Sequence, residues 1–162
     1  MCFVTYENTP KTATKDIVTY KIVERIYPKR GSLDALVGIR FKAAHYKEQK
    51  YALNILYSAT GFKQKLTHYA KGHDPKLNPG CSAVYCTEGG FYSYESLDDA
   101  VYQFYRYQEW DYTTRFAIIK CVIPKGTQYY ESILPAGNNS RKIFCSELIR
   151  VIEYRNRKTW KK

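Results

Sequence analysis

The chain has 162 residues, 44% of them hydrophobic and 25% charged, and its formal net charge at pH 7 is +11. This composition excludes a wholly disordered chain, and the length suits one domain that buries about two thirds of its unfolded surface. No apolar run approaches the roughly 20 residues that a membrane helix needs. We therefore predict a single domain over residues 1–162, with an extended lead-in at 1–15, a basic tail at 155–162, and neither a membrane anchor nor a secretory signal.

The first half of the chain predicts strands and a long loop. Residues 16–27, DIVTYKIVERIY, alternate apolar and polar side chains and predict a strand with one buried face, and VGIRFKA at 37–43 predicts a second strand. Apolar positions in residues 45–59 favour a helix. The stretch 62–81, FKQKLTHYAKGHDPKLNPGC, lacks a regular period and contains two prolines, which indicates a basic loop.

The second half has the clearest helix signal. Ser96 precedes LDDAVYQFYRY at 97–107, with Asp99 in the position of an acidic capping box. The apolar stripe predicted to face the core comprises Leu97, Ala100, Val101, Phe104 and Tyr105. A short strand at 82–86, SAVYC, and a Gly-Gly turn with aromatic alternation from Phe91 come before this helix.

Strands follow the helix. RFAIIKCVI at 115–123 predicts a central strand covered on both faces, with Cys121 in the core. PKG at 124–126 predicts a turn and TQYYE at 127–131 its hairpin partner, before an irregular 134–142 and a last strand within 143–154. The fold class predicted by this order is α+β, a mostly antiparallel sheet with one or two short helices.

Motifs for metal or catalytic chemistry are weak. His68, His73, Cys81 and Cys86 are residue types that bind zinc, but their spacing differs from that of structural zinc sites, so we predict no metal and no cofactor. The five cysteines are an odd number, which favours reduced thiols and a cytoplasmic location over a disulfide framework. Neither a Rossmann fingerprint nor a P-loop is present.

Positive charge and tyrosine are the two compositional anomalies. The tail and the loop at 61–79 carry eight of the eleven net charges, and the chain has 17 tyrosines. Clustered cations suit a polyanion, and tyrosine offers a face on which bases stack. The predicted ligand-binding residues are Tyr92, Tyr94, Tyr102, Arg106, Arg115, Lys120 and Lys125. The alternative that each is an ordinary surface or strand-edge residue stays open.

Four segments carry a resemblance to a known family. MCFVTYENTPKTATKDIVTYKIV, GGFYSYESLDDA, KCVIPKGTQYYES and FCSELIRVIE resemble a family of small uncharacterised proteins of Bacteroides-type gut bacteria and their phages. The resemblance covers both ends and the centre of the chain but not residues 29–78. It implies a phage or prophage context and, for a phage protein, a location in the host cell cytoplasm.

Three functional readings follow. The first is a non-catalytic binding protein for an anionic nucleotide-type ligand, by analogy a phage counter-defence protein that sequesters a host signalling nucleotide. The alternatives are a nucleic-acid-binding protein and a nucleotide-modifying enzyme of ADP-ribosyltransferase-like type, for which Glu131 and Glu147 are the candidate carboxylates. A pocket of arginine and tyrosine favours the first reading, a flat basic stripe the second, and a pocket with perturbed carboxylates the third.

Overall fold

The computed structural model describes residues 3–5, 9–39, 41–43, 49–68, 84–110, 115–136 and 139–155. Within these ranges all strand pairings are antiparallel, and they build one sheet of ten strands and one of three. The predicted mostly antiparallel sheet is therefore confirmed, but of the two helices in the described residues only one is short. No helix in the described part of the chain has the length and apolar character needed to span a membrane.

The ten-stranded sheet has the order β2-β11-β12-β9-β3-β10-β13-β6, and β4 pairs with β3 and β5. Its strands are β2 (Lys11–Thr12), β3 (Ile17–Arg25), β4 (Phe41–Ala43), β5 (Lys50–Tyr51), β6 (Leu56–Ser58), β9 (Phe91–Tyr94), β10 (Phe116–Ile123), β11 (Gln128–Ala136), β12 (Asn139–Ser146) and β13 (Leu148–Arg155). The smaller sheet has the order β1-β8-β7, from β1 (Phe3–Thr5), β8 (Val84–Glu88) and β7 (Lys63–His68).

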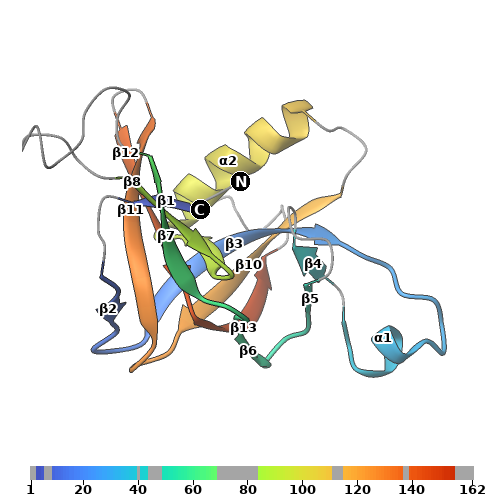
Figure 1. Cartoon of the computed structure of the whole chain (residues 1–162). Coiled ribbons are helices and arrows are strands. Elements are labelled where there is room, and N and C mark those ends of the chain that lie inside the picture. Colours follow the sequence, from blue (N-terminus) through green and yellow to red (C-terminus); the bar gives the residue numbers. More distant parts are fainter. Residues whose placement is uncertain are drawn as a thin grey trace, which may run out of the picture.

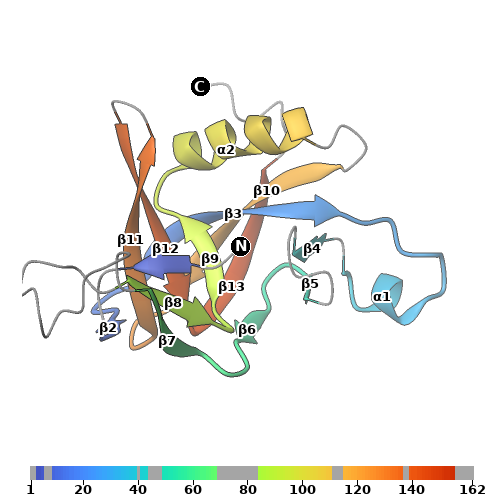
Figure 2. The ribbon, with the colours of Figure 1, turned by 45° about the horizontal axis from the view of Figure 1, so that its top comes forward.

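Helix α2 (Leu97–Trp110) covers one face of the large sheet, and β3 and β10 run beneath it (Figures 1 and 2). Its Ala100, Phe104 and Tyr107 pack on Ile22 and Ile118 of these strands. Because strand side chains alternate between faces, the intervening residues form a second cluster on the other face. That cluster contains Val23, Ile119 and Cys121, among others. The prediction of β10 as a central strand covered on both faces is confirmed, as is the burial of Cys121.

The start of α2 follows the predicted capping box. The Ser96 hydroxyl accepts a hydrogen bond from the Asp99 amide at 3.1 Å and donates one to the Asp99 carboxylate at 2.7 Å. One core position was predicted wrongly: Tyr105 is 44% exposed, and Tyr107 is buried instead. The helix continues to Trp110, so its buried stripe runs from Ala100 through Phe104 to Tyr107, and Tyr105 lies on the flank.

One charged side chain lies inside the large sheet. Lys21 on β3 is 8% exposed, its Nζ donates to the Tyr92 carbonyl at 2.8 Å, and it lies 5.9 Å from the centre of the Tyr51 ring. Burial lowers the pKa of the Lys21 amine to about 8, and the nearby Cys121 and Cys145 thiols oppose this shift. The fold thus holds a cation where desolvation disfavours its charged form.

Two predictions fail in the first half of the chain. Residues 50–58 form β5 and β6 and not a helix, because Tyr51 is buried in the sheet cluster while Ile55 and Leu56 are exposed, so no continuous helical face is buried. Residues 63–68 form β7, paired with β8, and not the start of a loop. Residues 69–83, which include the rest of that predicted loop, lie outside the described residues.

The predicted hairpin of 115–131 is also wrong. Strand β10 pairs with β3 and β13, which occupy both of its edges, so β11 crosses to pair with β12 and β2. Residues 134–136 and 139–142, predicted to be irregular, extend β11 and β12. Glu147 separates β12 from β13 in the segment predicted as one last strand. The basic tail beyond residue 155 lies outside the described residues.

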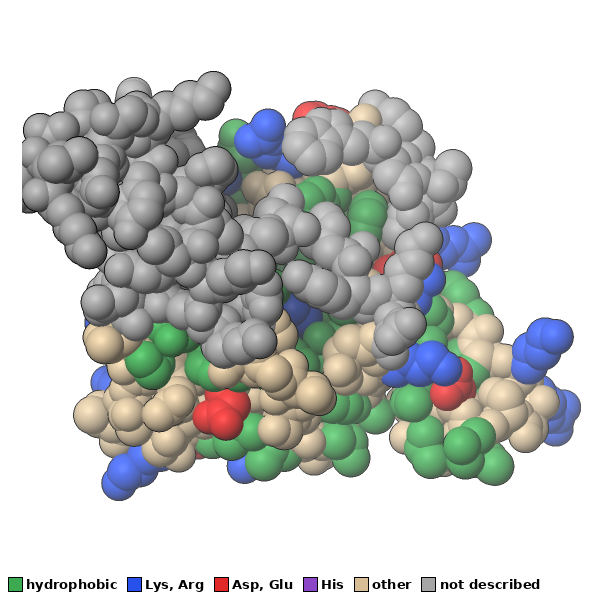
Figure 3. All heavy atoms as spheres, viewed as in Figure 1, with side chains coloured by type: hydrophobic (Ala, Val, Ile, Leu, Met, Phe, Trp, Pro, Cys, Tyr) green, Lys and Arg blue, Asp and Glu red, His purple; other side chains and the backbone are tan. Residues whose placement is uncertain are grey.

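The connection from β3 to β4 contains a short helix that was not predicted, α1 (Leu33–Leu36), and it stands out at one end of the molecule (Figures 1 and 2). Ser32 caps α1, and its leucines, Leu33 and Leu36, are 73% and 76% exposed. Figure 3 shows apolar side chains gathered on this end of the surface, beside basic ones. The ion pair of Asp34 with Lys50, at 2.6 Å, ties α1 to β5.

Candidate functional site

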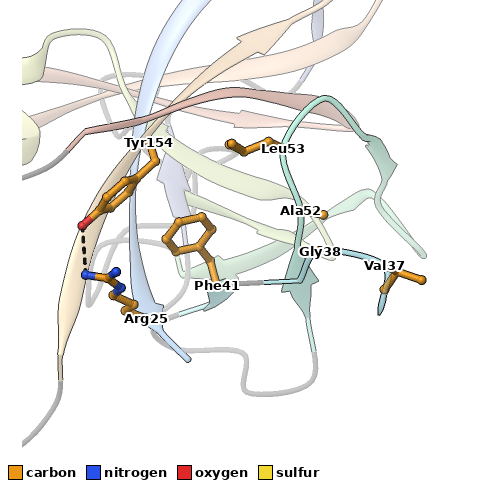
Figure 4. Close-up of a pocket in the computed structure, with 7 residues that line it drawn as sticks. All are labelled: Arg25, Val37, Gly38, Phe41, Ala52, Leu53 and Tyr154. Atoms are coloured by element: carbon orange, nitrogen blue, oxygen red, sulfur yellow. Dashed lines mark hydrogen bonds between the residues drawn. The ribbon is translucent and has the colours of Figure 1, made fainter. Parts of the chain in front are cut away.

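A pocket of about 380 Å³ lies between the α1 end and the edge of the large sheet. Its lining comes from four separate segments of the chain (Figure 4). The lining residues are Arg25, Val37, Gly38, Phe41, Ala52, Leu53 and Tyr154. These described lining residues are apolar except for Arg25 and the hydroxyl of Tyr154, so they place an apolar wall beside a positive charge.

Strand pairing places the aromatic and basic groups of the pocket together. Arg25 is the last residue of β3 and lies opposite Phe41 in the register with β4. Tyr154 comes from β13, and its ring stacks on Phe41 with centroids 5.2 Å apart and planes at 29°. The Arg25 guanidinium lies 5.5 Å from the centre of the Tyr154 ring, and its Nη1 is 3.5 Å from the Tyr154 hydroxyl. Figure 4 shows Arg25 at the hydroxyl end of Tyr154, with Phe41 beside it.

The opposite wall of the pocket is formed by residues near α1 and β5. Ala52 is buried, whereas Leu53 and Val37 are 44% and 53% exposed and form apolar parts of the rim. Gly38 has a φ of 72°, in the left-handed region that disfavours any side chain, and apart from its chain neighbours no atom of the described residues lies within 4 Å of where its Cβ would be. The rim at Gly38 is therefore open.

A second arginine lies beside the first. Arg115 precedes β10, and its carbonyl accepts a hydrogen bond from the Arg25 amide at 2.7 Å. The guanidinium carbons of Arg25 and Arg115 lie 5.2 Å and 5.4 Å from the centre of the Tyr27 ring. Arg25, Arg115 and Tyr27 thus form an arginine–tyrosine cluster next to the pocket. Tyr27 is 61% exposed, so the cluster lies at the surface.

The charge of this cluster is not neutralised within the described ranges. Neither Arg25 nor Arg115 has a carboxylate within 4 Å there. The nearby carboxylates have other partners: Glu24 pairs with Lys42 at 3.0 Å and Asp34 with Lys50 at 2.6 Å. Two guanidiniums that lie on aromatic rings, with no acidic partner among the described residues, are suited to bind an anion.

Of the predicted ligand-binding residues, only Arg115 lies at this cluster. Tyr94 lies beneath α2, where burial raises the pKa of its phenol and where it hydrogen-bonds with Tyr107. The Arg141 guanidinium carbon lies over one face of the Tyr102 ring, 3.4 Å from its centre, while Tyr102 itself is 49% exposed. Tyr92 packs against Tyr130 and Cys145.

The remaining predicted residues do not meet. Lys120 pairs with Glu153 at 3.9 Å, and Arg106 is exposed on α2. Arg106 adjoins Tyr107, which packs on Phe116 at the start of β10, while Lys125 follows the end of that strand. A strand of this length extends roughly 23 Å at 3.3 Å per residue. The structure therefore does not bring Arg106 and Lys125, both predicted to bind the ligand, to one place.

The two candidate carboxylates of the enzyme alternative do not line the pocket, and part of the weak zinc pattern lies outside the described residues. Glu131 pairs with Lys11 at 2.7 Å, and neither it nor Glu147 lines the pocket. Among the described residues no group of three or more histidines, cysteines or acids is placed to hold a metal. His73 and Cys81 of the weak zinc pattern are outside those residues.

No protein-family model matches the chain, and no curated protein or solved structure is significantly similar to it. The resemblance to proteins of Bacteroides-type bacteria and their phages therefore stays a prediction from the sequence.

Proposed function

We propose that the protein is a non-catalytic binding protein for an anionic ligand of nucleotide type, and that the ligand occupies the pocket lined by Arg25, Phe41 and Tyr154. The observation that carries this proposal is the arginine–tyrosine cluster, two guanidiniums without a carboxylate partner in the described part of the chain beside an apolar pocket. The phosphate of the ligand would contact Arg25, and its flat ring would lie in the apolar pocket.

The size and lining of the pocket favour this ligand class. A volume of about 380 Å³ is near the lower end for small-molecule sites, which suits one nucleoside or a molecule of that size. The stacked Phe41 and Tyr154 rings provide aromatic contacts for a base. Among the described residues of the lining, Arg25 is the one charged side chain and none is a carboxylate, which supports binding over general acid–base chemistry.

The biological setting remains part of the proposal. A small basic protein that binds a nucleotide without converting it lowers the free concentration of that nucleotide. Together with the resemblance to phage-associated proteins, this supports the sequestration of a host signalling nucleotide as a counter-defence role. Binding to nucleic acid is the competing function, and the sequence observation that favours it is the clustering of positive charge in the tail and the loop at 61–79.

Calorimetry with nucleosides and with mono-, di- and cyclic nucleotides tests the proposal. We expect one site per chain and a 10- to 100-fold weaker affinity in Arg25→Gln, because a charge-assisted hydrogen bond contributes about 1.5–3 kcal/mol. Tyr154→Phe keeps the ring and should weaken binding only a few-fold. Arg150→Gln is the matched control, since it removes the same charge from an exposed position on β13 that is not in the pocket lining.

Two results would redirect the proposal. If Lys125→Gln weakens binding as much as Arg25→Gln, the ligand also contacts Lys125, one of the residues predicted from the sequence, and the pocket alone is not the site. If no nucleotide binds, while an oligonucleotide binds with an affinity that falls steeply with salt and is shared among many lysines, the protein binds nucleic acid. Binding that the Arg25 substitution leaves unchanged would exclude the pocket.

A further inference from the structure

The arginine–tyrosine cluster extends past the pocket. Arg25 belongs both to the pocket lining and to the cluster, whereas Arg115 and Tyr27 belong to the cluster alone. The two guanidinium carbons lie within about 11 Å of each other, the largest separation that their distances to the Tyr27 ring allow. The pocket therefore has a second cation next to its charged wall.

The position of Arg115 is fixed by the backbone. The hydrogen bond from the Arg25 amide to the Arg115 carbonyl, 2.7 Å long, joins the end of β3 to the residue before β10. The neighbouring register pairs Phe116 with Glu24. Because these contacts belong to the central strands of the sheet, they keep the backbones of the two arginines adjacent, and the contacts with Tyr27 bring the two guanidiniums to one ring.

Both guanidiniums are exposed and contact the same Tyr27 ring. At the largest separation that the ring distances allow, their mutual repulsion is largely screened, because the screening length at physiological ionic strength is about 8 Å. In the described ranges no carboxylate lies within 4 Å of either arginine. A ligand with negative charge at both places would pair with both cations.

We infer that the ligand carries two phosphate groups, one held by Arg25 at the pocket and the second by Arg115 beside Tyr27. This inference rests on the proposed function, and it narrows the ligand class to nucleoside diphosphates and nucleotides with a comparable second phosphate. Arg115 would then determine specificity for the second phosphate, while the pocket and Arg25 bind the part that mononucleotides share.

The test compares a nucleoside monophosphate with the corresponding diphosphate in the unmodified protein, in Arg115→Gln and in Arg25→Gln. We expect the diphosphate to bind about tenfold more tightly than the monophosphate to the unmodified protein, from one additional charge-assisted contact. Arg115→Gln should abolish this tenfold preference and leave monophosphate affinity within about twofold. Arg25→Gln should weaken both ligands, and Arg150→Gln should change neither the affinities nor their ratio.

Three results would overturn the inference while leaving the proposed function intact. Equal weakening of both ligands by Arg115→Gln would mean that one phosphate bridges the two arginines. No effect of Arg115→Gln on either ligand would exclude Arg115 from the site. A preference for the diphosphate that persists in Arg115→Gln would place the second phosphate elsewhere. By contrast, absence of all nucleotide binding, or binding that Arg25→Gln leaves unchanged, would contradict the proposed function itself, and the inference with it.

Discussion

Positively charged side chains have different partners in the covered middle of the large sheet and at its open end beside α1. In the middle, Lys21 donates to the Tyr92 carbonyl, and Arg141 pairs with Asp99 while it covers Tyr102. At the open end, Arg25 and Arg115 lie on tyrosine rings, and the described residues place no acid within 4 Å of them. Cations in the middle thus have backbone or acidic partners, whereas those at the open end contact tyrosines and, among the described residues, no acid.

This difference shows why residue type alone does not locate a site. Arginine and tyrosine occur together in both regions, as the contact of Arg141 with Tyr102 and that of Arg25 with Tyr154 demonstrate. In the first pair the arginine also has Asp99 at 3.4 Å, and its side chain is only 10% exposed. In the second pair the guanidinium has no such acid in the described ranges and borders a pocket. Uncompensated charge at a cavity is the feature that distinguishes them.

The largest effect is expected at Lys21. Lowering the pKa of its amine from 10.5 to about 8 corresponds to about 3 kcal/mol of unfavourable free energy for the protonated form in the fold. Lys21→Met removes that cost and leaves the Tyr92 carbonyl without its donor, which costs about 1 kcal/mol. We therefore expect the free energy of unfolding to rise by about 2 kcal/mol at pH 7, measured by urea denaturation.

The pH dependence gives a second readout for Lys21. Between pH 8 and 10.5 the unfolded chain binds more protons at this lysine than the folded chain does, so the stability of the unmodified protein should rise with pH across that window. The advantage of Lys21→Met should be complete below pH 8 and disappear above pH 10.5. A destabilised Lys21→Met variant at pH 7 would show that the buried amine is a net stabilising contact.

The second effect in size, a loss of stability, is expected at Arg141. Its guanidinium carbon lies 3.4 Å from the centre of the Tyr102 ring and its Nε 3.4 Å from Asp99, and its side chain is 10% exposed. Arg141→Ala should lower the free energy of unfolding by about 1.5 kcal/mol, because it removes a partly desolvated cation–π contact and leaves Asp99 without its partner.

The matched control for Arg141 is its neighbour. Lys142 pairs with Glu95 at 3.0 Å, but the two side chains are 36% and 50% exposed. Lys142→Ala should therefore change stability by at most about 0.5 kcal/mol. Equal losses for Arg141→Ala and Lys142→Ala in parallel urea titrations would mean that burial does not separate the two pairs, and the contrast between the regions would weaken.

The sequence predicted much of the secondary structure because its signals are local. The cap at Ser96, the strand at β3 and the doubly covered strand β10 each follow from the periodicity or spacing of adjacent residues. The pairing of strands is not local. Strand β11 follows a tight turn after β10 yet pairs with β12, because β3 and β13 already occupy the edges of β10.

The candidate site depends on this long-range strand pairing, and of its residues the sequence predicted only Arg115. Arg25, Phe41, Leu53 and Tyr154 come from segments up to about 130 residues apart, and their meeting follows from the registers of β3 with β4 and of β10 with β13. Arg115 was predicted as a site residue because it is basic and near aromatic residues in sequence. Its actual aromatic partner, Tyr27, is far along the chain, so no local pattern indicates the contact.

The smallest stability effect is expected at the open end of the sheet. Arg25→Gln and Arg115→Gln should each change the free energy of unfolding by less than about 0.5 kcal/mol, because both side chains are exposed and surface cation–π contacts are weak. Loss of the attraction to tyrosine is offset in part by relief of the repulsion between the two guanidiniums. That relief is larger at low ionic strength, so either variant should gain relative to the unmodified protein when salt is removed. Glutamine also keeps the backbone hydrogen bond between residues 25 and 115, so the strand ends remain joined.

A loss of 2 kcal/mol or more in either variant would show that the fold itself requires the guanidinium, and the two regions would then use their cations in the same way. Unchanged stability together with weakened nucleotide binding would instead establish that the open end of the sheet keeps its positive charge for a ligand.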